Sequence, residues 1–391
     1  MNDVQVLFLI LAGVYFLQCI GWAPLESDVL RIGWRFRAKV LNGGLCMRFG
    51  QHKLFLLNPL SPLSGAIVCE WFPSVRSGDE GSPARSNPLE PGGIAGRQTI
   101  SLNWQEKQPI HVTGKEVRSA GSVLFVAHSQ AYANFLAGVL NRVRKRSPKE
   151  RDRAFELEFE KMFDTQKGSL RLEEYKSRTA FLRTTCALLF VFLFLMVPVL
   201  VRLRGLEHVW PVLLAYLIWS LACIGWSFLR AHRALYPEQK EGRWQQVLVL
   251  ALSPYSAIRA NDVLLRDLFS AFHPLSVACL FLSKQECRVQ AERSLRQSLY
   301  GGDKDATSSD PAMRRALESF LEKTGTPRED LLRPPHRKSE NCRTYCPLCL
   351  AQFVLVEGEC PDCEEVQLKV FPPGNASVQP DRPALTDTAG S

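Results

Sequence analysis

Two long apolar runs without a charged residue constrain this chain more than any other feature. They are Thr184–Val201 and Val209–Leu229. The hydrocarbon core of a bilayer is about 30 Å thick, so about 20 helical residues cross it. Only seven residues, Arg202–His208, separate the runs, and unpaired backbone is not tolerated in lipid. We therefore expect an antiparallel transmembrane helical hairpin over residues 181–230.

A third apolar run, Val4–Ile20, lies at the N-terminus. A cleaved signal peptide is the alternative interpretation of such a run. However, no basic residue precedes it, and no small-residue cleavage motif follows it before Gly21. The sequence therefore predicts an uncleaved anchor over residues 1–23, and three transmembrane helices in all.

Lysine and arginine residues near the ends of the three runs predict the orientation. They cluster after the first run, before the second and after the third, whereas the link between the second and third has only Arg202 and Arg204. Cytoplasmic flanks carry the excess of these residues. We expect an integral protein of the cell inner membrane, with its N-terminus outside and its bulk and C-terminus in the cytoplasm.

Residues 247–283 form a fourth apolar region, which raises the alternative of a fourth crossing. Four charged residues interrupt it: Arg259, Asp262, Arg266 and Asp267. A single amphipathic helix over Tyr255–Phe272, beside the membrane and with its charges exposed, explains the pattern better. Residues 231–300 are therefore predicted to be a membrane-proximal helical region.

Residues 24–180 are predicted to form a small cytoplasmic α+β domain. Leu30–Val40 alternates apolar and basic residues, as a half-buried strand does, and Asn42-Gly43-Gly44 predicts a hairpin turn before the alternation resumes through Phe49. A loop rich in Pro, Gly and Ser follows at 73–96. Further strands are expected at Gln98–Trp104, Ile110–Thr113 and Val123–Ala127, and helices from Ser129 and from the capping box at Ser147 through Phe163.

Residues 301–341 are predicted to be a linker with short helices. One is expected from Ser309 through Lys323, and a second is expected to start at a capping box, Thr326-Pro327-Arg328-Glu329. The Pro-rich residues 372–391 are predicted to be a disordered tail.

Four cysteines near the C-terminus carry the most specific motif. Cys346-x-x-Cys349 and Cys360-x-x-Cys363 are two close pairs, separated by a stretch of the length of a hairpin. Two thiolates spaced in this way reach one ion from a tight turn, and two such turns close a tetrahedral site. Strands are expected at Phe353–Leu355 and at Val366–Val370, paired around a turn at Glu357-Gly358. Residues 342–371 thus predict a metal-binding hairpin.

This motif resembles the zinc-ribbon family over Cys346–Cys363 and its flanks. The resemblance implies a structural Zn²⁺ and a β-hairpin used for contacts with proteins or nucleic acids. A rubredoxin-like iron site is the alternative, because it shares the paired knuckles and the Cys360-Pro361-Asp362-Cys363 turn. Leu350 and Glu364, however, stand where such iron sites favour glycine. Four thiolates leave no open position on the ion, so we expect a structural role.

The net charge of +9 is consistent with nucleic-acid binding, contact with anionic lipid or cytoplasmic loop bias. No nucleic-acid fold signature accompanies it, so nucleic acid is not the expected partner. We found no catalytic motif, and the histidines are scattered. The sequence favours a non-enzymatic membrane scaffold or assembly protein that binds a protein partner through its ribbon. A membrane-bound enzyme, with an active site in 24–180 or near 255–273, is the alternative.

Overall fold

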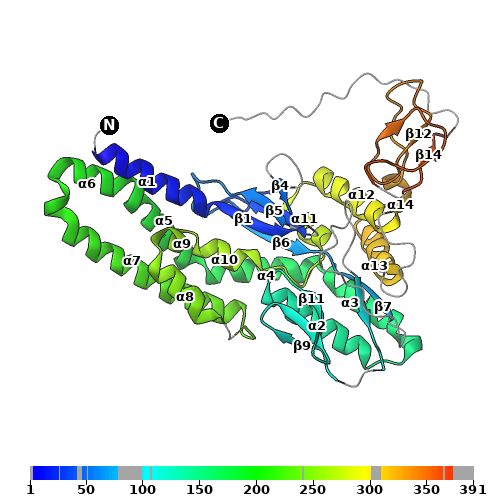
Figure 1. Ribbon diagram of the computed structural model, residues 1–391, viewed down its shortest axis with the longest axis horizontal. Coiled ribbons are helices and arrows are strands. Elements are labelled where there is room, and N and C mark those ends of the chain that lie inside the picture. The colour runs from blue at the N-terminus through cyan, green and yellow to red at the C-terminus, as the bar shows by residue number, and fades with distance from the viewer. Residues whose placement is uncertain are drawn as a thin grey trace.

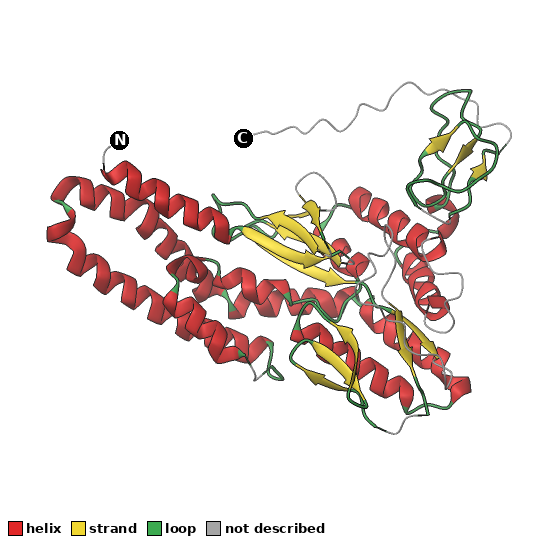
Figure 2. Ribbon diagram, viewed as in Figure 1, coloured by secondary structure: helices red, strands yellow, loops and turns green. Residues whose placement is uncertain are grey.

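The computed structural model describes residues 3–25, 27–41, 46–50, 52–77, 99–105, 108–239, 242–300, 310–363 and 366–372. The molecule is elongated, with a helical hairpin at one end and a small three-stranded unit at the other (Figure 1 and Figure 2). The predicted turn at 42–44, most of the loop at 73–96 and all but the first residue of the tail at 372–391 lie outside the described residues.

Two helical stretches are long and apolar enough to cross a membrane: Ala180–Arg204, with 25 residues, and Leu206–Leu235, with 30. The first comprises α5 (Ala180–Val191), a π-helical turn (Phe192–Met196) and α6 (Val197–Arg204), and the second is α7. Pro198 has no N–H to donate, which accounts for the widened turn before it. Gly205, with φ of 74°, joins the two stretches. The predicted helical hairpin is present (Figure 1).

The N-terminal helix α1 (Asp3–Gln18) packs against this hairpin. The ring of Phe8 lies 6.4 Å from Phe194, and Tyr15 lies 5.5 Å from Phe190 and 5.1 Å from Phe194. At 1.5 Å per residue, α1 is about 24 Å long, which is less than the thickness of a bilayer core. The structure therefore contains an apolar first helix but does not confirm the expectation of three membrane-spanning helices.

The predicted single helix over Tyr255–Phe272 is wrong. The chain runs back along α7 as α8 (Arg243–Leu252), turns at Ser253, and continues as α9 (Pro254–Ile258) and α10 (Ala260–Arg266). Ser253 caps α9 by accepting a hydrogen bond from the Ser256 amide at 3.2 Å. Within 247–283 the structure has no helix of spanning length.

Arg259 is buried at the break between α9 and α10, with 4% of its surface exposed, so the expectation that its charge is exposed is wrong. Its guanidinium lies 5.1 Å from the centre of the Tyr15 ring of α1. It donates hydrogen bonds of 2.9–3.1 Å to three backbone carbonyls, those of Asn58, Ser61 and Ser64. A buried charge needs such partners, and here they tie the loop before β6 to the helices.

Asp262, 5% exposed, is also buried against expectation. Its carboxylate accepts a 2.7 Å hydrogen bond from the Ala66 amide and a 3.0 Å hydrogen bond from Arg266. Gly65 allows this close approach, since a Cβ there would lie 3.0 Å from the Asp262 carboxylate and 2.7 Å from Leu265. Asp262 therefore joins α10 to β6 (Gly65–Glu70) instead of facing solvent.

The predicted strand Leu30–Val40 is two strands. β2 (Ser27–Ile32) ends in a tight turn in which Phe36 has φ of 58°, and β3 (Ala38–Val40) folds back so that Leu30 pairs with Val40. Two short strands around a turn keep the same alternation as one long strand, so the pattern alone does not separate them. β6 completes this sheet beside β2.

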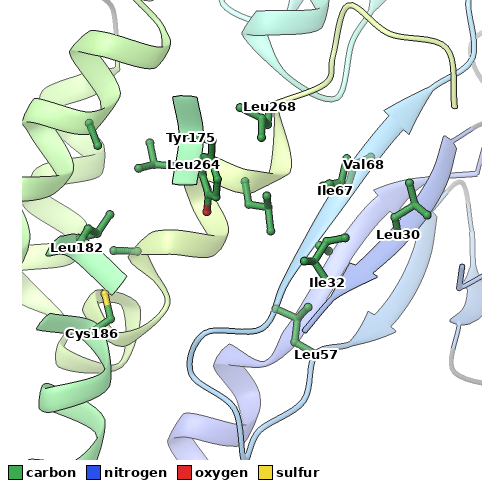
Figure 3. Packing of buried hydrophobic residues seen from close by; sticks show 14 of the residues in the cluster. Leu30, Ile32, Leu57, Ile67, Val68, Tyr175, Leu182, Cys186, Leu264 and Leu268 are labelled. Carbon is green, nitrogen blue, oxygen red and sulfur yellow. The ribbon is translucent and has the colours of Figure 1, made fainter. Parts of the chain in front are cut away.

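A second sheet has the order β1-β5-β4, with β1 (Ile20–Pro24), β5 (His52–Leu56) and β4 (Cys46–Phe49). Both sheets share a core with α4 (Thr165–Arg178), the hairpin and α9–α10. Figure 3 shows strand residues such as Ile32 and Ile67 on one side of this core, opposite Leu182 and Leu264 from the helices.

A separate core joins residues from 72–163 to the helices near the C-terminus. It contains the parallel pair β7 (Ser74–Ser77) and β8 (Thr99–Leu102), and the antiparallel strands β9 (His111–Thr113), β10 (Glu116–Ser119) and β11 (Ser122–Val126). Helices α2 (Gln130–Arg144) and α3 (Arg151–Met162) cover them. The predicted helix start at Ser129 is confirmed, and this residue is the N-cap of α2. The predicted capping box of Ser147 and Glu150 is confirmed as well. Residues 24–180 thus contribute to both cores.

Four further helices complete the body: α11 (Pro274–Phe281), α12 (Lys284–Tyr300), α13 (Asp310–Lys323) and α14 (Arg328–Leu331). α13 packs on α3 and α12, which gives its narrow apolar stripe a place in the second core. The predicted capping box at Thr326 is wrong, because α14 begins after Pro327 without a side-chain cap.

Candidate metal centre

The first cysteine pair lies in a tight turn that follows β12 (Thr344–Tyr345). The Leu350 amide donates to the Cys346 carbonyl at 3.0 Å, and the Cys349 amide points at the Cys346 sulfur at 3.5 Å. Leu350 takes a left-handed conformation with φ of 64°. This turn places the sulfurs of Cys346 and Cys349 on the same side.

The second pair follows the turn at Gly358, where φ is 135°. The Cys360 amide donates to the Val366 carbonyl at 2.9 Å, and the Cys363 amide donates to the Cys360 carbonyl at 3.3 Å. An antiparallel bridge between Glu359 and Gln367 holds the strands that flank this pair. The second turn therefore faces the first from its own short hairpin.

The four sulfurs of Cys346, Cys349, Cys360 and Cys363 all lie within 4.8 Å of one another. The sulfurs of Cys349 and Cys360 are 3.7 Å apart. A tetrahedral ion with metal–sulfur bonds of about 2.3 Å requires sulfurs about 3.8 Å apart. The residues therefore fit one metal ion with four sulfur ligands. Neither Cys342 nor His336 belongs to the cluster.

Burial raises the pKa of the Cys349 thiol to about 11 and that of Cys363 above its usual range. A divalent cation acts in the opposite sense, because it binds the thiolate and releases the proton. Proton and metal therefore compete for the same sulfurs, so the metal is held less tightly at low pH.

The sheet around the cysteines differs from the predicted hairpin. β13 (Gln352–Phe353) and β14 (Lys369–Val370) do not pair with each other; β12 lies between them and pairs with both. The central strand Thr344–Tyr345 is only two residues long, which is too short to give an alternating pattern. The result is still a three-stranded, zinc-ribbon-like unit built around the cysteines.

Arg296 of α12 holds this unit, the ribbon (residues 342–371), against the helical body. Its side chain is buried and donates to the carbonyls of Pro347, Leu331 and Arg333 at 2.9, 3.1 and 3.0 Å. Pro347 lies inside the first cysteine turn. On the other side of the ribbon, the Lys369 ammonium donates to the Tyr300 hydroxyl at 2.9 Å. The sequence had not singled out Arg296, because a buried arginine has no local pattern.

The ribbon exposes aliphatic side chains that lie outside its small core. Val354, Leu355 and Val356 are consecutive, and each is between 51% and 66% exposed; Val370 of β14 is also exposed. These residues form no part of the small core around Cys346, Cys360 and Val366. We call Val354–Val356 the aliphatic run of the ribbon.

Among the scattered histidines, His128 follows β11 and is half-buried. Its amide donates to the Glu70 carboxylate at 3.0 Å, and burial lowers the pKa of its imidazole to about 4. Burial raises the pKa of nearby Asp267 to about 6, although a hydrogen bond with Ser129 opposes the shift. His111 is an exposed residue of β9, and His273 is a buried N-cap of α11.

Cys279 is bonded to Cys287 in a disulfide. Their Cα atoms are 5.3 Å apart, and the bond links α11 to the first turns of α12. The separation of eight residues across the turn at Ser283 was the only signal in the sequence.

Comparisons with known protein families, with curated proteins and with solved structures find no match to this chain.

Proposed function

We propose that this protein is a membrane-anchored, non-enzymatic scaffold or assembly protein whose ribbon binds a protein partner at the cytoplasmic face. The helical hairpin lies in the inner membrane, with α1 as an additional anchor and the N-terminus outside. Basic residues at the body-proximal ends of the hairpin, such as Arg183 and Arg230, support this orientation.

The ion that we propose for the four cysteines is Zn²⁺ in a structural role. Four thiolates in tetrahedral arrangement are typical of zinc, and they leave no position free for a substrate. The ribbon has three short strands and a core of a few side chains, so its folding requires the free energy of metal binding, which amounts to about 10 kcal/mol or more.

One observation carries the proposal of protein contact: the aliphatic run Val354–Val356 is exposed on a unit that metal binding and Arg296 hold rigid. Consecutive exposed aliphatic side chains are costly in water and are typical of interaction surfaces. The ribbon lies far from the hairpin (Figure 1), so its exposed aliphatic run is available to a partner in the aqueous phase.

The test compares three forms of the full chain expressed in its native membrane: wild type, Cys346→Ser/Cys349→Ser, and Val354→Ser/Leu355→Ser/Val356→Ser. Each is solubilised, purified, and its co-purifying proteins are identified. We expect the same partner to be lost from both variants, because one unfolds the ribbon and the other alters only its surface. An unchanged partner set in both variants rules out recruitment by the ribbon.

A control replaces an exposed aliphatic residue outside the ribbon. Leu60, in the turn before β6, is 85% exposed. Leu60→Ser should retain the partner. Loss of the partner from this variant as well would show that general surface polarity, and not the aliphatic run, governs binding.

A further inference from the structure

The sheet β1-β5-β4 has one apolar face that the described residues leave uncovered. Trp22 pairs with Leu54, which pairs with Met47 on the other side; in the next row, Pro24 pairs with His52, which pairs with Phe49. Residues directly opposite one another in antiparallel strands point to the same face. This face, which we call the aromatic face, therefore carries Trp22, Pro24, Met47, Phe49, His52 and Leu54.

Its large side chains are exposed by 45% at Trp22, 64% at Met47 and 67% at Phe49. Trp22 and Phe49 meet edge to face at 5.7 Å, so the exposed rings form one patch. The opposite face of the sheet packs against the first core, to which Ala23 and Phe55 belong. Phe55 is buried beneath β1, and a Cβ at Gly21 would lie 2.3 Å from its ring.

The aromatic face continues the apolar surface of α1. Phe16 and Leu17 at the end of α1 are exposed, and three residues later the chain enters β1. The guanidinium of Arg259 donates a 2.8 Å hydrogen bond to the sulfur of Cys19, the residue before β1. The aromatic face thus begins where the apolar surface of α1 ends, without a charged residue between them.

The apolar segment of the hairpin ends near Arg259, which also contacts the start of β1. Cys186 of α5 donates from its sulfur to the Ala257 carbonyl at 3.3 Å, two residues before Arg259. Arg183, one helical turn earlier in α5, is the last charged residue before the apolar run. Phe181 and Trp226 meet there at 6.3 Å on the two helices of the hairpin. Aromatic side chains are enriched at this boundary between acyl chains and headgroups.

We propose that the aromatic face of β1-β5-β4 lies in the headgroup layer of the membrane, so that the sheet rests on the lipid beside α1. The proposal depends on the membrane anchoring proposed above. Tryptophan has an apolar body and a polar N–H, which suits this layer. Among the described residues of this face, His52 is the one with an ionisable side chain. Arg48 lies on the opposite side of β4, where its charge does not enter the lipid.

The test measures the depth of Trp22 by fluorescence quenching. The full chain is reconstituted in vesicles of phosphatidylcholine and phosphatidylglycerol, with bromine placed either near the headgroup or near the acyl-chain end. The emission of Trp22 is obtained as wild type minus Trp22→Phe. We expect shallow bromine to remove most of this emission and deep bromine to remove much less of it.

Trp104→Phe provides the matched control, because Trp104 packs on Phe155 in the second core, away from the hairpin. Its emission should be unchanged by either bromolipid. A Trp22 emission that is equally insensitive to both lipids overturns the proposal, since the face is then in water or under another protein.

A second variant, Met47→Asp/Phe49→Asp, places charges on the aromatic face without altering the hairpin. It should lower the quenching of Trp22 by shallow bromine; unchanged quenching contradicts a role for these side chains. Alkaline carbonate extraction separates this proposal from membrane anchoring. If carbonate releases the wild-type chain, the anchoring fails. If the chain stays in the membrane but Trp22 is not quenched, only the proposal for the sheet fails.

Discussion

At the scale of a residue, the backbone conformation of Leu350 closes the first cysteine turn of the metal site. The first cysteine turn requires a left-handed residue after Cys349, and leucine with φ of 64° fills the position. This conformation costs a residue with a Cβ about 1–2 kcal/mol. The closure of the turn, with Cys346 accepting from the Leu350 amide, offsets the cost.

Leu350→Gly should therefore stabilise the metal-bound ribbon by up to about 1 kcal/mol, because glycine takes this conformation without strain. The measurement is the chelator concentration at which half of the metal leaves the purified full chain. Gly325→Ala is the matched opposite, since Gly325 has φ of 69° after α13, outside the ribbon. It should lower the melting temperature without changing metal release. A lower chelator midpoint for Leu350→Gly contradicts this account.

Asp267 gives a prediction about pH. Its folded pKa of about 6 exceeds the ordinary value of 3.8, because burial penalises the carboxylate. The folded state therefore holds a proton that the unfolded state has lost between these pH values, so the contribution of Asp267 to stability falls as pH rises from 3.8 to about 6.

Asp267→Asn removes this dependence. The melting temperature of the variant minus that of wild type, measured in detergent, should rise from about pH 4 to about pH 6 and stay level above. His128 is common to both proteins, so its opposite dependence cancels in the difference. A difference that does not vary with pH, or that falls, shows that Asp267 is not buried as described.

At this scale the four cysteines could be predicted from the sequence, whereas the burial of Arg259 and Asp262 could not. The spacing of ligands is local, because both members of a pair share a single turn. Whether an arginine is buried depends on which distant carbonyls reach it. The partners of Arg259 come from 195 to 201 residues away in the sequence, and no local pattern encodes them.

At the scale of elements, α12 holds the ribbon against the body through hydrogen bonds of Arg296. Arg296→Ala leaves the carbonyls of Pro347, Leu331 and Arg333 without their donor, at a cost of at least about 2 kcal/mol. We expect faster amide hydrogen exchange at 344–350 and at 331–333, while the metal stays bound.

Arg293→Ala is the control for this change, because Arg293 lies in the same helix but is exposed. It should leave exchange at both segments unaltered. If Arg296→Ala also leaves them unaltered, the ribbon is held to the body by other contacts.

Long elements, in which apolar residues recur at a regular spacing, could be predicted from the sequence. Strands of a few residues could not. The long apolar helices α5–α7 and the capped helices α2 and α3 have clear patterns over many residues. β2, β3 and β12 span six, three and two residues, so their pairing depends on tertiary contacts. The break at Arg259 follows from burial of its charge, which a helical period does not reveal.

At the scale of the whole molecule, each core combines segments that are far apart in the sequence. The strands from 20 to 70 pack with the hairpin, and α12–α14 return to the core built by 72–163. Such long-range packing could not be deduced from consecutive segments, although the hairpin at one end and the metal unit at the other could.

The proposed topology makes a prediction about Cys279 and Cys287. The structure closes a disulfide between them, but the cytoplasm keeps thiols reduced. If this part of the chain is cytoplasmic, the bond should therefore be open in intact cells, and both residues should be alkylated by a membrane-permeant reagent. Cys279→Ser and Cys287→Ser each identify one of the labelled positions. Protection of both thiols until a reductant is added indicates that this part of the chain lies outside the cytoplasm and that the orientation is inverted.

In the proposed function, a metal-bound ribbon on a membrane anchor contacts a protein partner. The most direct measurement places a photo-reactive amino acid at Leu355, irradiates native membranes and examines the adducts of the chain. We expect a discrete protein adduct at Leu355 that is absent when Cys346→Ser/Cys349→Ser is introduced, and absent with the probe at Leu60. No adduct at Leu355, or the same adduct without the cysteines, contradicts it.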